Sequence, residues 1–396
     1  MATSQIVPET ALTVEQENAR LLVLLTPMPE DQLQAVVTHL AEAFSPSDLV
    51  VAAPEPLPQS TDAKLRMIAV AGTRASWTLT AADFAHAHQL AQEHEPKAVL
   101  LLGPESSSMQ AEALSNLAQA VLESPNDLAV PCYEVPARTG LINSAILYPL
   151  SRALFAARPR FPLAIDLAFS PRMAARLGNA AQRFLNLNQS EAPLWPLNEA
   201  AVAGFAVTET RAGKRATPQP ADPDLHTILP IVAGSLFADI EAKAAFWQRP
   251  RQAPPTRGLL RIEQAEESAS DTSALVQAFR LGYTNLQEIW SLVLPPNAML
   301  GLKRLVQEDA PQFKMPDTLW ARIVYDFLLA WRLRTIHRGH LMGALVPLYL
   351  AWVAGHLHST AGGTTPEQHI EAVATAFEAE KPYLVSRWRW PDRFNP

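Results

Sequence analysis

The sequence predicts an α/β protein, with a mostly parallel sheet sandwiched by helices and an α-helical C-terminal domain after it. Over the first 130 residues, short unbroken apolar runs alternate with amphipathic segments, which is the pattern of parallel strands joined by helices. From about residue 228 the pattern becomes helical. We therefore expect a flexible leader over residues 1–19, an α/β domain over 20–226 and a helical domain over 227–396.

The composition is that of a globular chain with a large core. Of its 396 residues, 48% are hydrophobic and 18% are charged, and the formal net charge is −7. A chain of this length is long enough for two domains. The sequence contains no dense run of Lys and Arg, so we expect no nucleic-acid partner.

Three further features predict a cytoplasmic protein. The single cysteine, Cys132, excludes an intramolecular disulfide and suits a reducing compartment. The first residues show no basic head followed by an apolar core, so we expect no secretory signal. The most apolar run, Leu341–Ala354, is too short to span a bilayer and contains Pro347, so we expect a buried core helix and no membrane partner.

In the α/β domain the apolar runs predict five strands, over residues 21–25, 48–53, 65–70, 98–102 and 128–130. Amphipathic segments predict a helix from Asp31, a helix from the candidate cap Thr80 to about His94, and a helix over 109–122. Ligands of such sheets bind at the carboxyl ends of the strands. The candidate site therefore lies among the loops after Leu25, Ala53, Val70 and Leu102.

The second half is harder to divide. Residues 178–225 show little periodicity and are rich in Asn, Pro and Ala, so we expect long loops over a cleft. Beyond them we expect one helix over 229–247, a Pro/Arg-rich linker, and helices over 273–292, 317–336, 341–356 and 366–388.

One carboxylate is out of place in an apolar setting. The stretch Ile142–Ser170 passes from an apolar helix through a basic turn to a short apolar segment that contains Asp166. A buried charge is costly, so such a residue is usually paired, hydrogen-bonded or functional. We expect Asp166 at the floor of an active-site cleft, or held by Arg158 or Arg160 for structural reasons.

The same stretch carries a family resemblance. Residues 145–170, AILYPLSRALFAARPRFPLAIDLAFS, resemble the centre of bacterial family-2-like glycosyltransferases related to glucosylglycerate and mannosylglycerate synthases. Residues 222–241, 313–354 and 377–389 resemble later parts of that family. The resemblance implies a GT-A fold with a helical C-terminal domain. It also implies retaining transfer of a hexose from a nucleotide sugar to a small acid such as glycerate or phosphoglycerate, with Mg²⁺ or Mn²⁺ as cofactor.

Several residues depart from the family pattern for the metal and its diphosphate. Where the family has Asp-x-Asp, this chain has Gly103, Pro104 and Glu105, so Glu105 is the remaining candidate ligand. The family's metal-binding His corresponds to Ala216, and a further family carboxylate corresponds to Pro193. Arg215 is a candidate for offsetting diphosphate charge.

The loops that would face the nucleotide keep fewer polar groups than the family has. Glu30 remains after the first strand and Arg74 after the third, and the resemblance makes both candidate contacts of the nucleotide. The family's glycines before Asp166 have become Ala164 and Ile165. Glycine lets a ligand approach the backbone closely, so these side chains are expected to fill part of the donor site.

Two functional hypotheses remain open. The first is a transferase in which Asp166 acts at the sugar and acceptor, Glu105 contacts metal or phosphate, and Arg74 or Arg215 offsets diphosphate charge. The second is a catalytically inactive paralogue that serves as a binding or assembly partner. Under either hypothesis the apolar helical domain favours a homodimer.

Overall fold

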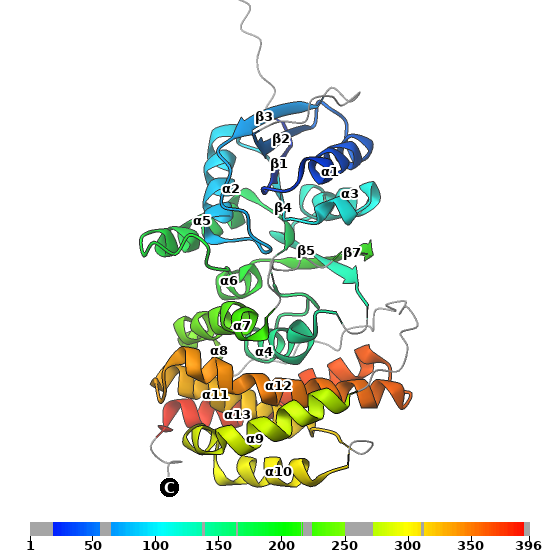
Figure 1. Ribbon diagram of the computed structural model, residues 1–396. Coiled ribbons are helices and arrows are strands. Elements are labelled where there is room, and N and C mark those ends of the chain that lie inside the picture. Colours follow the sequence, from blue (N-terminus) through cyan, green and yellow to red (C-terminus); the bar gives the residue numbers. More distant parts are fainter. Residues whose placement is uncertain are drawn as a thin grey trace, which may run out of the picture.

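The computed structural model describes residues 19–55, 65–136, 139–163, 165–214, 216, 224–249, 272–309 and 313–391. Figure 1 shows a layer built on a β-sheet above a layer built of helices. Residues 1–18 of the leader, residues 250–258 of the Pro/Arg-rich linker, Ala164 and Arg215 lie outside the described residues.

The sheet has seven strands in the order β3-β2-β1-β4-β6-β5-β7. They are β1 Leu21–Leu25, β2 Leu49–Pro54, β3 Arg66–Val70, β4 Ala98–Leu102, β5 Leu128–Glu134, β6 Asp166–Phe169 and β7 Val207–Lys214. Neighbouring strands run parallel, except that β6 is antiparallel to both β4 and β5. The predicted mostly parallel sheet is confirmed, and Asp166 begins its antiparallel strand.

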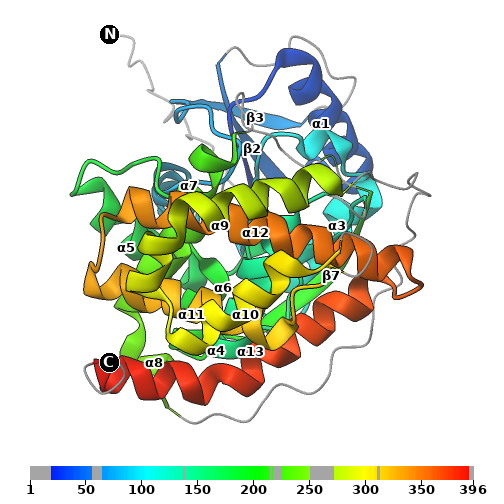
Figure 2. The ribbon, with the colours of Figure 1, turned by 60° about the horizontal axis from the view of Figure 1, so that its bottom comes forward.

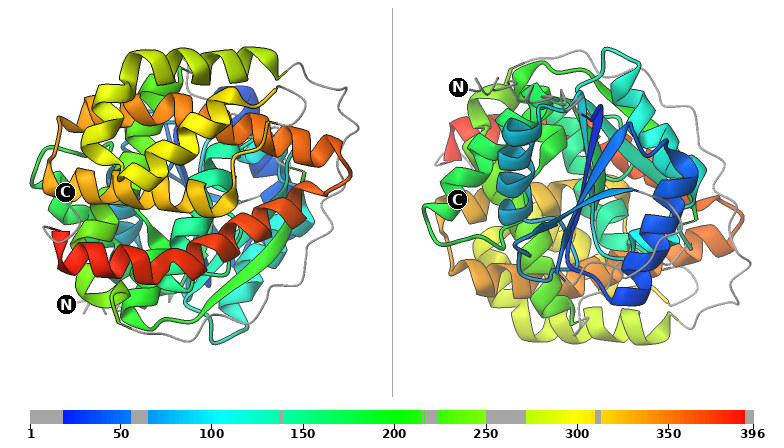
Figure 3. Two further views of the ribbon diagram at one scale, coloured as in Figure 1. Left: turned by 90° about the horizontal axis from the view of Figure 1, so that it is seen from below. Right: turned by 90° about the horizontal axis from the view of Figure 1, so that it is seen from above.

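Helices cover both faces of the sheet. Helices α1 (Glu30–Ala43) and α3 (Ala111–Leu122) cover one face, and α2 (Ala81–His94) and α5 (Pro171–Leu185) cover the other. The view from above in Figure 3 shows the strands between these two helical layers. The strands β1, β2 and β4 are therefore buried on both faces, which explains their unbroken apolar sequences.

The helical layer contains α7 Leu225–Ala242, α8 Ala244–Trp247, α9 Ser273–Val293, α10 Pro296–Gln307, α11 Asp317–Leu333, α12 Arg338–Ala361 and α13 Pro366–Arg389. Helix α12 packs against α9 and α7 (Figure 2). Both α7 and α12 are long and apolar enough to cross a membrane by length and composition, but 72% of the apolar window of α12 is buried inside the fold. The prediction of a buried core helix there is confirmed.

Residues 141–155 belong to the core of the helical layer, although they precede its helices in sequence. They form a π-helical segment, Asn143–Leu147, that continues into α4, Tyr148–Phe155. Leu147, Leu150 and Leu154 are buried in the same cluster as the helices of residues 225–389. The indole Nε1 of Trp320 donates to the carbonyl oxygen of Ala145 at 2.8 Å, which ties α11 to this segment.

Two expectations about the second half are wrong, and one helix was not predicted. Residues 178–225 are not long loops, because they contain most of α5, a helix α6 (Pro196–Ala203) and β7. The apolar face of α5 is built largely from alanine and includes Gly178, whose missing side chain lets His88 of α2 pack closely. Met173, Leu177 and Phe184 recur at helical spacing, so the sequence does carry the period of this helix, and the expectation of loops from residue 178 onward misread it.

The expected single helix over 229–247 is broken at Lys243, which separates α7 from α8. Helix α10 was not predicted at all. It begins with Pro296, which suits a first helical position, but its twelve residues bury only three side chains, those of Ala298, Leu302 and Leu305.

Candidate functional site

The candidate site lies at the carboxyl ends of the parallel strands β1, β2, β3 and β4, which together form one edge of the sheet. Thr26, just after β1, donates its backbone N–H to the carbonyl oxygen of Leu102 at 3.0 Å, and its hydroxyl to the same oxygen at 3.1 Å. The ends of β1 and β4 are thereby fastened together. The loops after β3 and β4 lie over this edge, as the strand order predicts.

Asp166 is fully buried beside this edge, with 0% of its surface exposed. Its Oδ1 accepts a hydrogen bond from the backbone N–H of Gly103 at 3.0 Å. Its Oδ2 accepts one from the hydroxyl of Tyr133 at 2.8 Å. Both oxygens of the carboxylate are therefore used inside the protein, where they link the end of β4 to β5 and β6.

Gly103 is required by the close approach of two backbones at this point. A Cβ atom added to Gly103 would lie 2.5 Å from the carbonyl oxygen of Ile165, which is closer than real Cβ contacts. The missing side chain lets the N–H of Gly103 reach Asp166. Ile165 is itself buried, so its side chain and carbonyl occupy the space directly before Asp166.

The loop of residues 71–79 lies across the ends of β1 and β2. A Cβ on Gly72 would stand 3.3 Å from Pro54, the last residue of β2, and 3.8 Å from Pro27, which follows β1. The cavity left between this loop and the strand ends has a volume of about 10 Å³. That is room for about one water molecule.

Asp83 holds this loop to the first turn of α2. Its Oδ1 accepts a hydrogen bond from the hydroxyl of Thr73 at 2.6 Å, and its Oδ2 accepts from the backbone N–H of Thr80 at 2.7 Å. Thr80 is the N-cap of α2 in a capping box, as the sequence predicted. Burial raises the pKa of the Asp83 carboxyl, while the bonds from Thr73 and Thr80 act to lower it.

The predicted nucleotide contacts stand apart from Asp166. Glu30 is exposed in the first turn of α1. Arg74 is exposed and forms an ion pair with Glu191, in the segment after α5. Neither side chain makes a hydrogen bond or ion pair with Asp166 among the described residues, and Arg215 lies outside them. Their assignment to a nucleotide stays a prediction.

Glu105 lies on the loop after β4, where its backbone adopts the left-handed region with φ of 65°. The carbonyl oxygen of Glu105 accepts from the hydroxyl of Ser108 at 2.8 Å. The same hydroxyl accepts from the backbone N–H of Ala216 at 3.1 Å. The loop after β4 and the end of β7 therefore meet, and these are the two segments that the family resemblance assigns to the metal.

The described residues at this meeting point do not fit a divalent cation. Mg²⁺ and Mn²⁺ need several hard oxygen ligands. Glu105 offers one carboxylate, while Ala216 offers a methyl group where the family has an imidazole. Within the described part of the chain, no group of three or more His, Cys, Asp or Glu side chains lies close enough to hold a metal.

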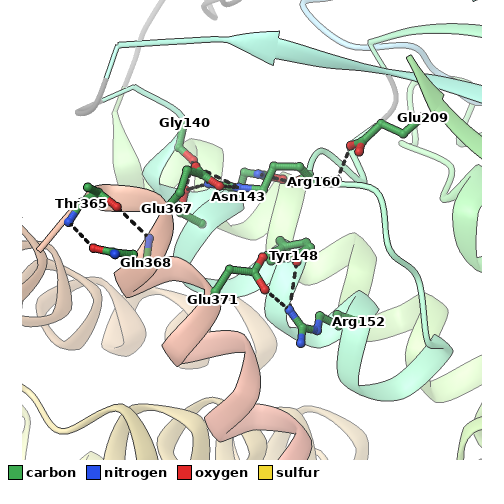
Figure 4. Close-up of polar contacts among 11 residues, drawn as sticks. Gly140, Asn143, Tyr148, Arg152, Arg160, Glu209, Thr365, Glu367, Gln368 and Glu371 are labelled. Atoms are coloured by element: carbon green, nitrogen blue, oxygen red, sulfur yellow. Dashed lines mark hydrogen bonds and ion pairs between the residues drawn. The ribbon is translucent and has the colours of Figure 1, made fainter. Parts of the chain in front are cut away.

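Sequence reasoning missed the ionic network that joins the two layers (Figure 4). Helix α13 presents Glu367 and Glu371, which Figure 4 shows, and also Glu378 on one face, because they are spaced by four and seven residues. Arg152 of α4 donates from Nε to Glu378 at 3.0 Å and also pairs with Glu371. The helical spacing of these carboxylates places them on one face and was visible in the sequence. The sequence did not show their arginine partners, because those lie more than 200 residues earlier.

Arg160 is the second cation of this network and is 3% exposed. Its Nε lies 3.2 Å from Glu367, and its Nη2 donates to the hydroxyl of Ser144 at 2.9 Å. Its backbone N–H donates to Glu209 of β7 at 2.7 Å. Arg160 therefore connects β7, the π-helical segment and α13 (Figure 4). Its guanidinium pairs with Glu367 and not with Asp166, so the structural partner suggested for Asp166 is not Arg160.

A buried chain of two histidines lies near the same junction. Nδ1 of His356 in α12 is 2.7 Å from Nδ1 of His369 in α13, and Nε2 of His369 is 3.2 Å from Asp317. The ring of Trp352 stacks on His356. Burial, with His369 and Arg160 nearby, lowers the pKa of His356 to about 3, so this imidazole is neutral at ordinary pH.

Comparison with known proteins gives a distant likeness of fold. No protein-family model and no curated protein sequence matches the chain. Among solved structures, the chain is similar to glucosyl-3-phosphoglycerate synthase from Mycobacterium tuberculosis in complex with Mg²⁺ and uridine diphosphate. The identity is 12% and the TM-score 0.37, over 59% of this chain and 81% of that one.

Two further structures show a similar degree of likeness. The same synthase in complex with Mn²⁺, uridine diphosphate and phosphoglyceric acid matches with 12% identity and a TM-score of 0.36, over 56% of this chain and 78% of that one. A CMP:2-keto-3-deoxy-manno-octonic acid synthetase complexed with CTP matches with 12% identity and a TM-score of 0.34, over 56% of this chain and 99% of that one.

Proposed function

We propose that this chain is a nucleotide-sugar-transferase-like protein that acts as a catalytically silent binding or assembly partner. In this proposal its donor edge, the carboxyl ends of β1, β2, β3 and β4 where a nucleotide sugar would bind, is closed. The observation that carries this proposal is the loop of residues 71–79. It lies against Pro54 and Pro27 and leaves about 10 Å³ at the strand ends. A pocket for a ligand the size of a nucleotide measures roughly 300–1,000 Å³.

The surroundings of Asp166 support the same proposal. A catalytic carboxylate must come within hydrogen-bond distance of the reacting group. Asp166 is fully buried, and its oxygens accept from Gly103 and Tyr133. In this conformation the carboxylate fixes the end of β4 against β5 and β6, which is a structural role.

One observation favours a second candidate, hexosyl transfer from a nucleotide sugar to a small polar acid of the glycerate or phosphoglycerate type. The loop that carries Glu105 meets the end of β7 through the Ser108–Ala216 hydrogen bond. In this candidate Glu105, Arg74 and Arg215 contact the phosphates and Asp166 contacts the sugar. The loop of residues 71–79 would have to leave the strand ends, and Asp166 would have to exchange its partners.

A turnover assay separates the two candidates. The full chain is incubated with UDP-, GDP- and ADP-glucose, with glycerate or 3-phosphoglycerate, and with Mn²⁺ or Mg²⁺, and release of the nucleoside diphosphate is measured. The silent protein releases none above a protein-free control. The transferase would be established instead by release of the nucleoside diphosphate that requires the acceptor and that the variant Asp166→Asn does not show.

An assembly role predicts a homodimer through the helical layer. Leu281 and Leu292 of α9 are each 63% exposed, and their spacing of eleven residues is about three helical turns, so they share one face. Light scattering coupled to size-exclusion chromatography measures the mass. We expect a dimer that Leu281→Glu converts to a monomer, whereas a monomeric wild-type chain would contradict this part of the proposal.

A further inference from the structure

A second cavity lies away from the sheet edge, at the junction of the two layers. It has a volume of about 540 Å³ and is lined by residues of α5, α6, α7 and α8. This size is in the range of small-molecule sites, which often lie between domains. The residues that line it are separate from the strand ends, so a ligand here is independent of the proposed function.

One wall of this junction cavity is apolar and partly aromatic. Phe184, Leu187, Trp195, Val202 and Phe246 contribute to it. Leu187 is 67% exposed, so it extends this apolar wall to the surface of the molecule. The indole N–H of Trp195 is buried and has no hydrogen-bond partner among the described residues, although a buried donor is normally satisfied. The wall therefore offers an apolar, partly aromatic surface.

The other wall carries charge with an excess of cations. Glu199 is 4% exposed, and its carboxylate is shared by Arg176 at 2.7 Å, Lys243 at 2.9 Å and Arg183 at 3.6 Å. Burial acts to raise the pKa of Glu199, but Lys243 and Arg176 hold it below its ordinary value. With Asp239, which also pairs with Lys243, the lining has three cationic and two acidic side chains.

The two arginines keep donors available for a ligand. Within the described part of the chain, Arg176 uses its Nε toward Glu199 and is 38% exposed, and Arg183 is 71% exposed and makes the long contact at 3.6 Å. A guanidinium presents several N–H groups in a fixed plane and binds carboxylate, sulfonate or phosphate oxygens well. The rim of the cavity therefore suits an anion whose body lies on the aromatic wall.

We propose that the junction cavity binds a small organic anion, with an aromatic or other apolar body against Trp195 and Phe246 and an acidic group at Arg176 and Arg183. Such a ligand would contact α5 and α6 of the sheet layer and α7 and α8 of the helical layer at once. Its binding would stabilise their junction.

The probe for the test is 8-anilino-1-naphthalenesulfonate, an aromatic anion that fluoresces when bound. We expect saturable binding to the full chain. Ala245→Trp, at an exposed position that lines the cavity, should abolish it by filling the space. Arg183→Gln should weaken it by about two- to fivefold, the effect of a partly exposed charge. A thermal melt confirms that each variant is folded.

Two controls make the test specific. Arg322→Gln removes an arginine that lines a different cavity, between α10, α11 and α13, and should leave the affinity unchanged. The uncharged probe N-phenyl-1-naphthylamine should bind more weakly and show no effect of Arg183→Gln. Unchanged binding of the sulfonate to folded Ala245→Trp, or equal effects of Arg183→Gln and Arg322→Gln, would overturn the proposal.

Discussion

The hydroxyl of Tyr133 lies 2.8 Å from Oδ2 of Asp166, across the neighbouring strands β5 and β6. Asp166 was the most conspicuous candidate for catalysis in the sequence, and this contact gives it another explanation. The tyrosine comes from a segment 33 residues earlier, and its ring packs edge-on against Phe161. The buried carboxylate is therefore part of the structure that holds the sheet together at its closed edge.

The Tyr133–Asp166 bond should contribute to stability. Tyr133→Phe removes the hydroxyl, so the buried carboxylate of Asp166 loses one of its hydrogen bonds. We therefore expect the free energy of unfolding to fall by about 1–3 kcal/mol. Chemical denaturation measures it. The matched control is Tyr283→Phe in α9, where the hydroxyl has no described hydrogen bond, and a change within about 0.5 kcal/mol is expected. Equal stability of Tyr133→Phe and wild type would remove the structural explanation of Asp166.

The Arg152 cluster should be a strong link between α4 and α13. Arg152 has 8% of its side chain exposed and pairs with Glu371 and Glu378, so Arg152→Met leaves two largely buried carboxylates without their cation. We expect a loss of about 3–5 kcal/mol in unfolding free energy. Arg322→Met breaks the more exposed pair with Glu380 and should cost about 0–1 kcal/mol. Similar losses for the two variants in denaturant titrations would contradict this difference.

His356 should make stability depend on pH. Its folded pKa of about 3 lies below the ordinary 6.5, so the unfolded chain binds the proton first and stability falls as the pH drops through the unfolded value. His369 in α13, Arg160 and Asp317 surround the ring. Between pH 7 and pH 5, protonation of this group in the unfolded chain should lower the free energy of unfolding by about 2 kcal/mol.

The variant His356→Gln isolates that contribution. It keeps a neutral polar side chain but does not titrate, so its unfolding free energy should change less between pH 7 and pH 5 than that of wild type. His340→Gln, at an exposed position of the same helix, should retain the full wild-type dependence. A parallel pH profile for His356→Gln and wild type would show that the imidazole is protonated equally in the folded and unfolded states.

The sheet was predictable from the sequence because local patterns decide it. LLVLL at residues 21–25 and AVLLL at 98–102 are buried on both faces, so their sequences are apolar at every position. The Thr80 cap of α2 was equally visible. Helix α5 was also visible, since Met173, Leu177 and Phe184 recur at helical spacing, but the expected loops of residues 178–225 cut across it.

The site was only half predictable. The sequence showed that Asp166 needed partners, and the structure supplies them in Gly103 and Tyr133. The expectation that the side chains at positions 164 and 165 fill part of the donor site stays a prediction. It did not show that Tyr133 would be one partner, nor that Glu367, Glu371 and Glu378 would meet Arg152 and Arg160. Those contacts join residues 33 to 226 positions apart, so they depend on the folded topology.

The closed donor edge is tested most directly by isothermal titration calorimetry of the full chain with UDP-glucose, in the presence and absence of Mn²⁺. The variant Asp83→Ala, which releases Thr73 and Thr80 from their anchor, is titrated in parallel. We predict no saturable heat for wild type under either condition. Saturable, Mn²⁺-dependent binding of UDP-glucose to wild type would contradict the closed edge and restore the transferase.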